Sequence, residues 1–143
     1  AIILAATGLQ KLQIEDEVKY FKPISTDDMI PSMGQATLGI ETLDNKEIID
    51  LVSVLHDKNA HIESTIERDF VRTLEGGCQV PIGVKATILK AIVGMPDGSE
   101  YIQEDIVANI EDFENVGKNL AQIFIDQGAK ELLARAEKVA FED

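Results

Sequence analysis

The hydrophobic pattern of the chain changes abruptly at Gly76-Gly77, and this change constrains the fold more than any other feature. Before it, over about residues 60–75, apolar side chains recur at the spacing of one helical face. After it, residues 79–107 are rich in β-branched side chains and are divided by a turn at 95–99, which indicates strands. One element cannot follow both periods, so the chain must pass from a helix into a sheet at the two glycines.

The remaining pattern completes a domain. Asp112 begins a predicted helix that ends at Gly128, and a last helix follows it. Residues 60–138 therefore have the order α-β-β-β-α-α, which predicts an α+β domain with a three-stranded antiparallel sheet covered by helices. No turn signal lies between Gly83 and Gly94, so this segment is either one long strand or a hairpin that has lost its loop.

The N-terminal part holds fewer elements. Residues 1–6 predict a buried strand and residues 37–41 a second strand, while residues 45–56 predict a helix that Asp44 or Asn45 caps. These elements are too few to close a core of their own. We therefore expect a fragment, in which they belong to a larger body.

Charge and cysteine content exclude several classes of function. The formal net charge is −13, from 26 acidic and 13 basic residues, whereas nucleic acids and anionic membranes require a basic surface. No apolar run approaches the roughly 20 residues that span a bilayer. The single cysteine forbids an internal disulfide and fits a reducing cytoplasm, so we expect a cytoplasmic protein that binds neither nucleic acid nor membrane.

That cysteine, Cys78, directly follows the two glycines. Glycine permits sharp bends and the close approach of a bulky group, so the thiol lies on a loop where it can be reached. Free cysteine is nevertheless among the most buried residue types, and local physics alone favours a half-buried structural role. The residues by themselves leave both interpretations open.

Five blocks of sequence resemble the hydroxymethylbilane synthases, which are also called porphobilinogen deaminases. The blocks occur in the order found in that family, from residue 1 to about residue 99. The stretch Glu75-Gly76-Gly77-Cys78-Gln79-Val80-Pro81-Ile82-Gly83 is similar to the family's cofactor-attachment signature. The other four blocks are Ala1 to Ala5 with Gly8, Leu9 and Leu12; Ile30 to Gln35 followed by Leu38 to Glu41; Glu67-Arg68 with Leu74; and Val93 to Ser99.

The resemblance implies a three-domain enzyme of which this chain is the C-terminal portion. Residues 1–44 would be the end of domain two and the strand that crosses to domain one, residues 45–59 a connecting helix and linker, and residues 60–143 the cofactor-carrying domain. The family's catalytic aspartate belongs to domain one, so we expect no catalytic residue here and no activity from this chain alone.

The resemblance also implies the chemistry. Cys78 would hold a dipyrromethane cofactor through a thioether, with Gly76, Gly77 and Gln79 around it. Four porphobilinogen molecules would be deaminated and condensed into hydroxymethylbilane. Lys11 would lie near the substrate, although an ordinary solvated helix lysine is an equal alternative. The expected partners are porphobilinogen, the growing oligopyrrole and the N-terminal domains, in a monomeric full-length enzyme.

Some residues depart from the family pattern, and other functions are possible for such a chain. Ala36 stands where the family usually has glycine, and residues 42–44 lack an expected arginine. His56 and His61 fit no common zinc spacing, so we expect no metal site. A redox enzyme would need a second cysteine. A non-enzymatic α+β interaction module, which needs no modified cysteine, remains the alternative.

Overall fold

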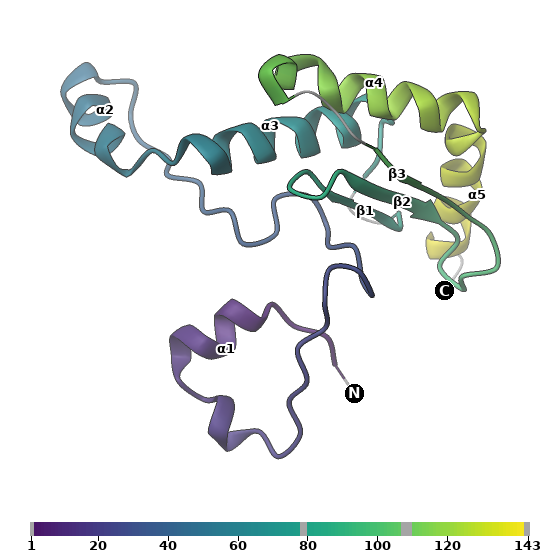
Figure 1. Ribbon diagram of the computed structural model, residues 1–143, viewed down its shortest axis with the longest axis horizontal. Coiled ribbons are helices and arrows are strands. Elements are labelled where there is room, and N and C mark those ends of the chain that lie inside the picture. Colours follow the sequence, from purple (N-terminus) through teal and green to yellow (C-terminus); the bar gives the residue numbers. More distant parts are fainter. Residues whose placement is uncertain (1, 78–79, 107–109, 142–143) are drawn as a thin grey trace.

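The structure is a computed structural model that describes residues 2–77, 80–106 and 110–141. Three helices cover a three-stranded sheet in the C-terminal body, and the N-terminal residues extend away from it (Figure 1). This arrangement confirms the predicted α+β class and the order α-β-β-β-α-α. The elements are α1 (Ala6–Leu12), η1 (Glu15–Glu17), α2 (Lys46–Val52), η2 (Ser53–Leu55), α3 (Lys58–Thr73), β1 (Ile82–Lys85), β2 (Lys90–Gly94), β3 (Tyr101–Asp105), η3 (Ile110–Asp112), α4 (Phe113–Asp126) and α5 (Ala129–Phe141).

The sheet is antiparallel throughout, in the order β1-β2-β3. Between β1 and β2 the chain turns within residues 86–89, where the Leu89 N–H donates to the Ala86 carbonyl oxygen over 3.2 Å. Of the two alternatives for this segment, one long strand is therefore wrong, and the segment forms a hairpin with a short turn. Leu89 takes a left-handed φ of 47° and is only 7% exposed. Burial of this side chain offsets a strained turn that contains none of the residues from which turns are usually recognised.

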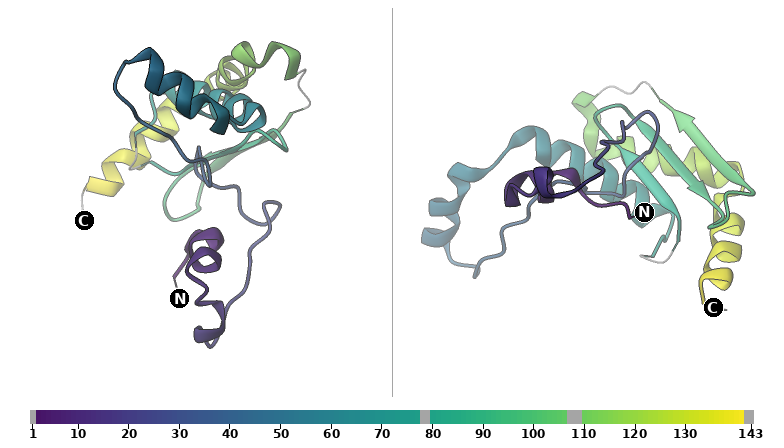
Figure 2. Two further views of the ribbon diagram at one scale, coloured as in Figure 1. Left: turned by 90° about the vertical axis from the view of Figure 1, so that its left-hand side faces the viewer. Right: turned by 90° about the horizontal axis from the view of Figure 1, so that it is seen from below.

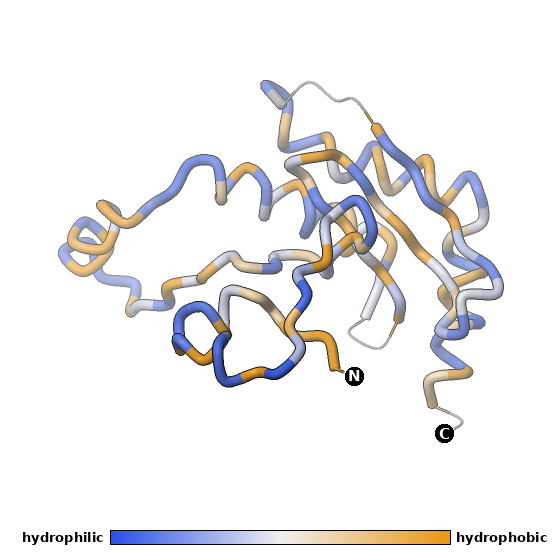
Figure 3. The backbone as a smooth tube through the Cα atoms, turned by 60° about the horizontal axis from the view of Figure 1, so that its bottom comes forward, coloured by the Kyte–Doolittle hydropathy of each residue, from blue (hydrophilic) through white to orange (hydrophobic). Residues whose placement is uncertain are grey.

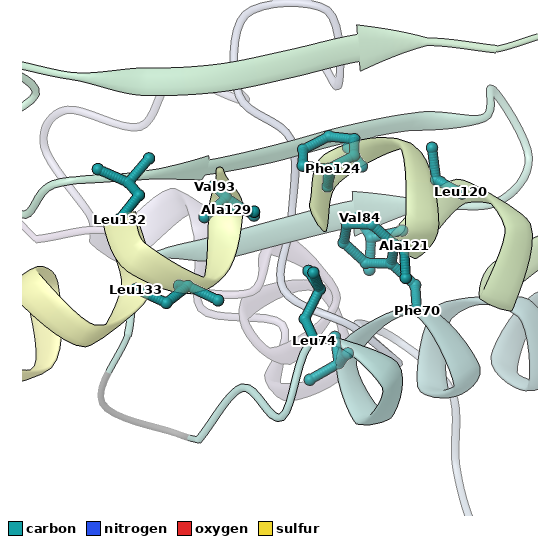
Figure 4. Packing of buried hydrophobic residues seen from close by; sticks show 12 residues of the cluster. Phe70, Leu74, Val84, Val93, Leu120, Ala121, Phe124, Ala129, Leu132 and Leu133 are labelled. Carbon is teal, nitrogen blue, oxygen red and sulfur yellow. The ribbon is translucent and has the colours of Figure 1, made fainter. Parts of the chain in front are cut away.

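The core lies between the sheet and the helices that cover it. Phe70 of α3 and Phe124 of α4 are fully buried at its centre, and Val84 and Val93 face them from the strands (Figure 4). Alternate strand residues point to the same face, which is why these two valines lie on the helical side of the sheet.

Helix α3 begins where its cap is. The Asp57 side chain accepts hydrogen bonds from the N–H groups of Asn59 and Ala60, at 2.8 and 3.0 Å, so the helix begins two residues earlier than predicted. Along α3, Ile66 and Phe70 face the core.

Helix α4 packs closely on α3 because Gly117 has no side chain. A Cβ there would overlap the Ile66 carbonyl oxygen and lie 3.0 Å from the Asp69 Cβ. Gly128, with φ 92°, follows the end of α4 as predicted. The predicted inward residues of α5 are also buried; they are Leu132, Leu133 and Ala136.

The N-terminal part lacks the two predicted strands. Ile2, Ile3 and Leu4 are exposed, and Leu38 is 92% exposed in an irregular segment. In Figure 3 the first described residues of the N-terminal part are orange, which marks them as hydrophobic. A strand needs a neighbour to receive its hydrogen bonds, and these segments pair with none of the described strands. The helix predicted in this part is confirmed as α2, which Asn45 caps.

Residues 27–35, here called the arm, join the N-terminal part to the C-terminal body. The Val84 N–H of β1 donates to the Pro31 carbonyl oxygen over 2.9 Å, and Lys90 lies 2.7 Å from Asp27. Gly83 permits the approach, since a Cβ there would lie 2.8 Å from the Ile30 carbonyl oxygen. The arm therefore passes beside the outer edge of the sheet (Figure 2).

Candidate functional site

The chain passes from α3 to β1 through the loop that holds the predicted cofactor-attachment residues. Cys78 and Gln79 lie outside the described residues, and their roles stay predictions. Gly76 and Gly77 precede them and Val80 follows them. The Val80 N–H donates to the Gly77 carbonyl oxygen over 3.5 Å, so the two ends of the loop lie close together.

Glu75, rather than a glycine, takes the left-handed conformation after α3, with φ 60°. Its N–H donates to the Arg72 carbonyl oxygen over 3.0 Å, and the Gly76 N–H donates to that of Val71 over 3.1 Å. The left-handed residue at the end of α3 is therefore Glu75 and neither of the two glycines. A non-glycine residue in this region costs about 1–2 kcal/mol, so the surrounding bonds must hold it there.

The two glycines of the loop have different surroundings. A Cβ on Gly76 would overlap the Ile82 Cδ1 and lie 3.5 Å from the Val71 Cγ1, so a larger residue here would force the end of the Ile82 side chain to turn aside. No atom lies within 4 Å of the corresponding point on Gly77. Open space therefore begins at the residue that directly precedes Cys78.

A groove of about 800 Å³ borders the far end of the loop. Pro81, Ile82 and Gly83 contribute to its wall, together with residues within 3–7 and 24–36 of the N-terminal part. Its lining is mostly apolar, and among the described lining residues Lys85 is the cationic one. The groove therefore offers apolar surface beside the loop, with a single basic side chain.

Two carboxylates neutralise Lys85. Its Nζ lies 2.9 Å from the Glu63 Oε2 and 3.6 Å from the Glu67 Oε1. Burial acts to lower the pKa of Lys85, but the hydrogen bond to Glu63 and the charges of both glutamates outweigh burial and raise it. The same hydrogen bond lowers the pKa of Glu63. This ammonium is therefore already paired and leaves no positive charge for an anionic ligand.

The structure does not bring Lys11 to the loop. It lies exposed in the last turn of α1, and α1 lies apart from the C-terminal body (Figure 1). The sequence-based alternatives of a substrate contact and a solvated helix lysine both stay open for this residue.

Sequence reasoning missed the most distinctive polar side chain of the described part. Glu67 is 2% exposed, although glutamate is rarely buried unless it is paired. A signal was present, because Glu67 follows Ile66 on the stripe of α3 that faces the core. Its Oε2 accepts a hydrogen bond from the Gly34 N–H over 2.7 Å, and its Oε1 accepts one from the Ala86 N–H over 3.0 Å.

Two other kinds of site find no support in the part of the chain that the structure describes. No group of three or more potential metal-ligating side chains occurs there. The rings of His56 and His61 lie 5.3 Å apart without a third ligand, and His61 packs against Phe113. None of the described helices combines the length and apolar character needed to cross a membrane.

Comparison with known proteins gives matches in both parts of the chain. Residues 1–50 match the family model described as porphobilinogen deaminase, dipyrromethane cofactor binding domain. Residues 61–126, which include the loop at Gly76 and Gly77, match the model described as porphobilinogen deaminase, C-terminal domain.

Individual relatives agree with the two models. A porphobilinogen deaminase of Aliarcobacter butzleri is 74% identical over 148 residues, which are 99% of this chain and 47% of the relative. Those of Campylobacter concisus and Sulfurimonas denitrificans are 53% and 49% identical, over 98% and 96% of this chain and 47% and 46% of the relatives. The chain thus spans about half the length of the curated relatives it matches. Because two successive regions match two domains of one family in order, the chain belongs to the porphobilinogen deaminase family.

Proposed function

We propose that this chain is the C-terminal part of a hydroxymethylbilane synthase and that Cys78 tethers its dipyrromethane cofactor. The observation that carries the proposal is the ordered match of residues 1–50 and 61–126 to two domains of one enzyme family. In this proposal residues 1–44 form the end of domain two and the strand that crosses to domain one. Residues 45–59 form a connecting helix and linker, and residues 60–143 form the domain that carries the cofactor.

The described ends of the loop suit a covalent tether. Packing of Gly76 against Ile82 fixes the end of α3, while the empty space around Gly77 leaves room for a substituent on the next residue. A thiol becomes a nucleophile as its thiolate, and a thioether, once formed, resists hydrolysis. Gly76 therefore anchors the loop, and Gly77 with Gln79 borders the attached group.

The bound cofactor would supply the first nucleophilic pyrrole α-carbon, and each porphobilinogen, after loss of ammonia, would be joined to the free α-carbon at the end of the growing chain. The pyrroles carry acetate and propionate groups, which require arginine or lysine partners. Lys85, the cation of the groove, is already paired with Glu63 and Glu67. We therefore place the carboxylate-binding groups and the catalytic aspartate in the first domains of the whole protein, with Lys11 as a further candidate contact.

The decisive test compares the whole protein with its Cys78→Ser variant by intact mass and a pyrrole-specific colour reaction. The wild type should carry a mass adduct that gives the colour, and the variant should lack both. A wild-type protein without an adduct or porphobilinogen consumption would contradict the proposal and favour the interaction module.

A second test concerns the 143-residue chain by itself. We expect no consumption of porphobilinogen by the purified chain, because the groups assigned to the first domains are absent from it. Measurable turnover by the chain alone would show that its own residues supply the catalytic groups.

A further inference from the structure

Two blocks that sequence analysis singled out separately meet at one carboxylate. Gly34, in the block of residues 30–35, donates its N–H to the Oε2 of Glu67 over 2.7 Å. The Oε1 of the same carboxylate accepts the N–H of Ala86 over 3.0 Å. Glu67 thus joins the arm, helix α3 and the turn after β1 at a point where its side chain is 2% exposed.

Only a carboxylate satisfies this arrangement. Each of the two N–H donors is bonded to a different oxygen, and glutamine offers one accepting oxygen and one donating NH₂ group. The negative charge is balanced by Lys85, whose Nζ lies 3.6 Å from the Glu67 Oε1. A buried donor that loses its acceptor is costly, so replacing either oxygen should release one of the two segments.

The arm is held mainly through its backbone. The Pro31 carbonyl oxygen accepts from Val84 of β1, and the Ile30 carbonyl oxygen lies against Gly83. These contacts bind the arm to the sheet. The hydrogen bond between Gly34 and Glu67, by contrast, binds the arm to helix α3.

Helix α3 connects this contact to the Cys78 loop. Glu67 lies about two turns before the end of α3 at Thr73, and the loop follows directly. Close packing of Gly117 against Ile66 holds the helix on α4. Gly34 belongs to the region matched by the cofactor-binding domain, and Glu67 to the region matched by the C-terminal domain.

We propose that Glu67 is a positioning residue, which fixes α3 and the loop at its end relative to the arm and so sets where Cys78 is presented to the cofactor-binding domain. That the placement serves pyrrole condensation rests on the proposed function. The contact between Glu67 and the arm stands independently of that function.

The first experiment measures amide hydrogen exchange in the full 143-residue chain. In Glu67→Gln the amide oxygen should take the Oε1 position beside the Lys85 ammonium, which leaves the NH₂ group facing Gly34. The Gly34 amide, having lost its acceptor, should exchange about tenfold faster, while the Val93 amide in the sheet stays protected. Glu63→Gln is the matched control: it lies one turn earlier on α3 and contacts the same Lys85, but it bonds no arm amide. This control should leave Gly34 unchanged.

Several outcomes of this measurement would overturn the proposal. They are unchanged exchange at Gly34 in Glu67→Gln, equal acceleration in Glu63→Gln, and equal acceleration at Gly34 and Val93. If Glu67→Gln does not fold, Gly34→Ala replaces it, because its φ of 68° disfavours a side chain. The residue 34 amide should then exchange faster while Ala86 remains protected, and protection of both would contradict the proposal.

The second experiment uses the whole protein and separates the two proposals. Glu67→Gln should retain the mass adduct on Cys78 but lose about tenfold in kcat, while Glu63→Gln matches the wild type. An unchanged kcat in a variant with faster Gly34 exchange would overturn the positioning role. If the wild type shows neither adduct nor turnover, the proposed function is wrong. The hydrogen-exchange experiment would still test the contact between Glu67 and the arm.

Discussion

The ring of Phe70 meets the ring of Phe124 edge to face, with centroids 5.1 Å apart and planes at 82°. One residue belongs to the helix before the sheet and the other to the first long helix after it. Both are 0% exposed, so this pair locks together the two parts of the chain that enclose the strands.

Phe124→Ala should lower the free energy of unfolding by about 3–5 kcal/mol, since it removes a buried ring and leaves a cavity against Phe70. Urea denaturation measures this loss. Phe141→Ala provides the control, because Phe141 is 65% exposed at the end of α5 and should change stability by no more than about 0.5 kcal/mol. Equal losses in the two variants would show that the ring pair is not a centre of the core.

Ala36→Gly should stabilise the segment that follows the arm. Ala36 has φ 70°, a region that costs an alanine about 1 kcal/mol and a glycine little. Slower hydrogen exchange of the Thr37 amide, which bonds to the Gly34 carbonyl oxygen over 2.9 Å, would report the gain. Ala134→Gly in the exposed face of α5 should have the opposite sign and cost about 1 kcal/mol. Faster exchange of the Thr37 amide in Ala36→Gly would show that the left-handed conformation of Ala36 does not strain the segment.

Gly76→Ala should cost more stability than Gly77→Ala, although the two residues are neighbours. The Cβ at residue 76 overlaps the Cδ1 at the end of the Ile82 side chain, which must turn aside, so we expect a loss of about 1 kcal/mol in thermal or urea unfolding. The Cβ at residue 77 has no atom within 4 Å, and a change of less than about 0.5 kcal/mol is expected. A reversed order would mean that the loop packs differently against β1.

The ion pair between Lys85 and Glu63 should make stability depend on pH in acid. Folding lowers the pKa of Glu63 from its ordinary 4.5, mainly through the hydrogen bond to Lys85. Its contribution is therefore complete above pH 4.5 and is lost as the pH falls through the lowered value. Folding raises the pKa of Lys85 above 10.5, so its contribution is present below that pH and is lost as the pH rises through the raised value.

Urea denaturation between pH 6 and pH 2 tests the acid limb, at roughly half-unit steps. Glu63→Gln should flatten the fall in unfolding free energy on the acid side of pH 4.5. Glu137→Gln, at an exposed position of α5, is the control and should leave the slope of the wild type. If the unfolding free energy falls with pH at the same slope in all three proteins, Glu63 does not contribute to the loss of stability in acid.

The C-terminal fold was predictable because its signals are local. The Asp57 side chain caps the start of α3, and Gly128 ends α4 in a left-handed conformation. The apolar stripe of α3 marks its buried face. The turn at residues 86–89 was not predictable, since it depends on the burial of Leu89 in a left-handed conformation. The strands predicted at residues 1–6 and 37–41 failed for a different reason: apolar sequence does not supply a pairing partner.

The candidate site was predictable only in part. Resemblance indicated the glycine loop, and the structure adds that Gly76 packs against the end of the Ile82 side chain. The bond from Gly34 to Glu67 joins residues 33 positions apart, and no local pattern could reveal it. A long separation in sequence also hid the neutralisation of Lys85, because its partner Glu63 lies 22 positions away on a different element.

The arm contacts α3 and β1 through backbone atoms, whereas α3 contacts the arm through one side chain, that of Glu67. Tolerance to mutation should consequently be unequal on the two sides of the contact. Most substitutions at Ser32 or Met33 leave the carbonyl of Pro31 and the N–H of Gly34 in place, so these two positions of the arm can vary. Position 67 accepts little besides glutamate, and a saturation library would show that asymmetry as a tolerant stretch facing an invariant residue.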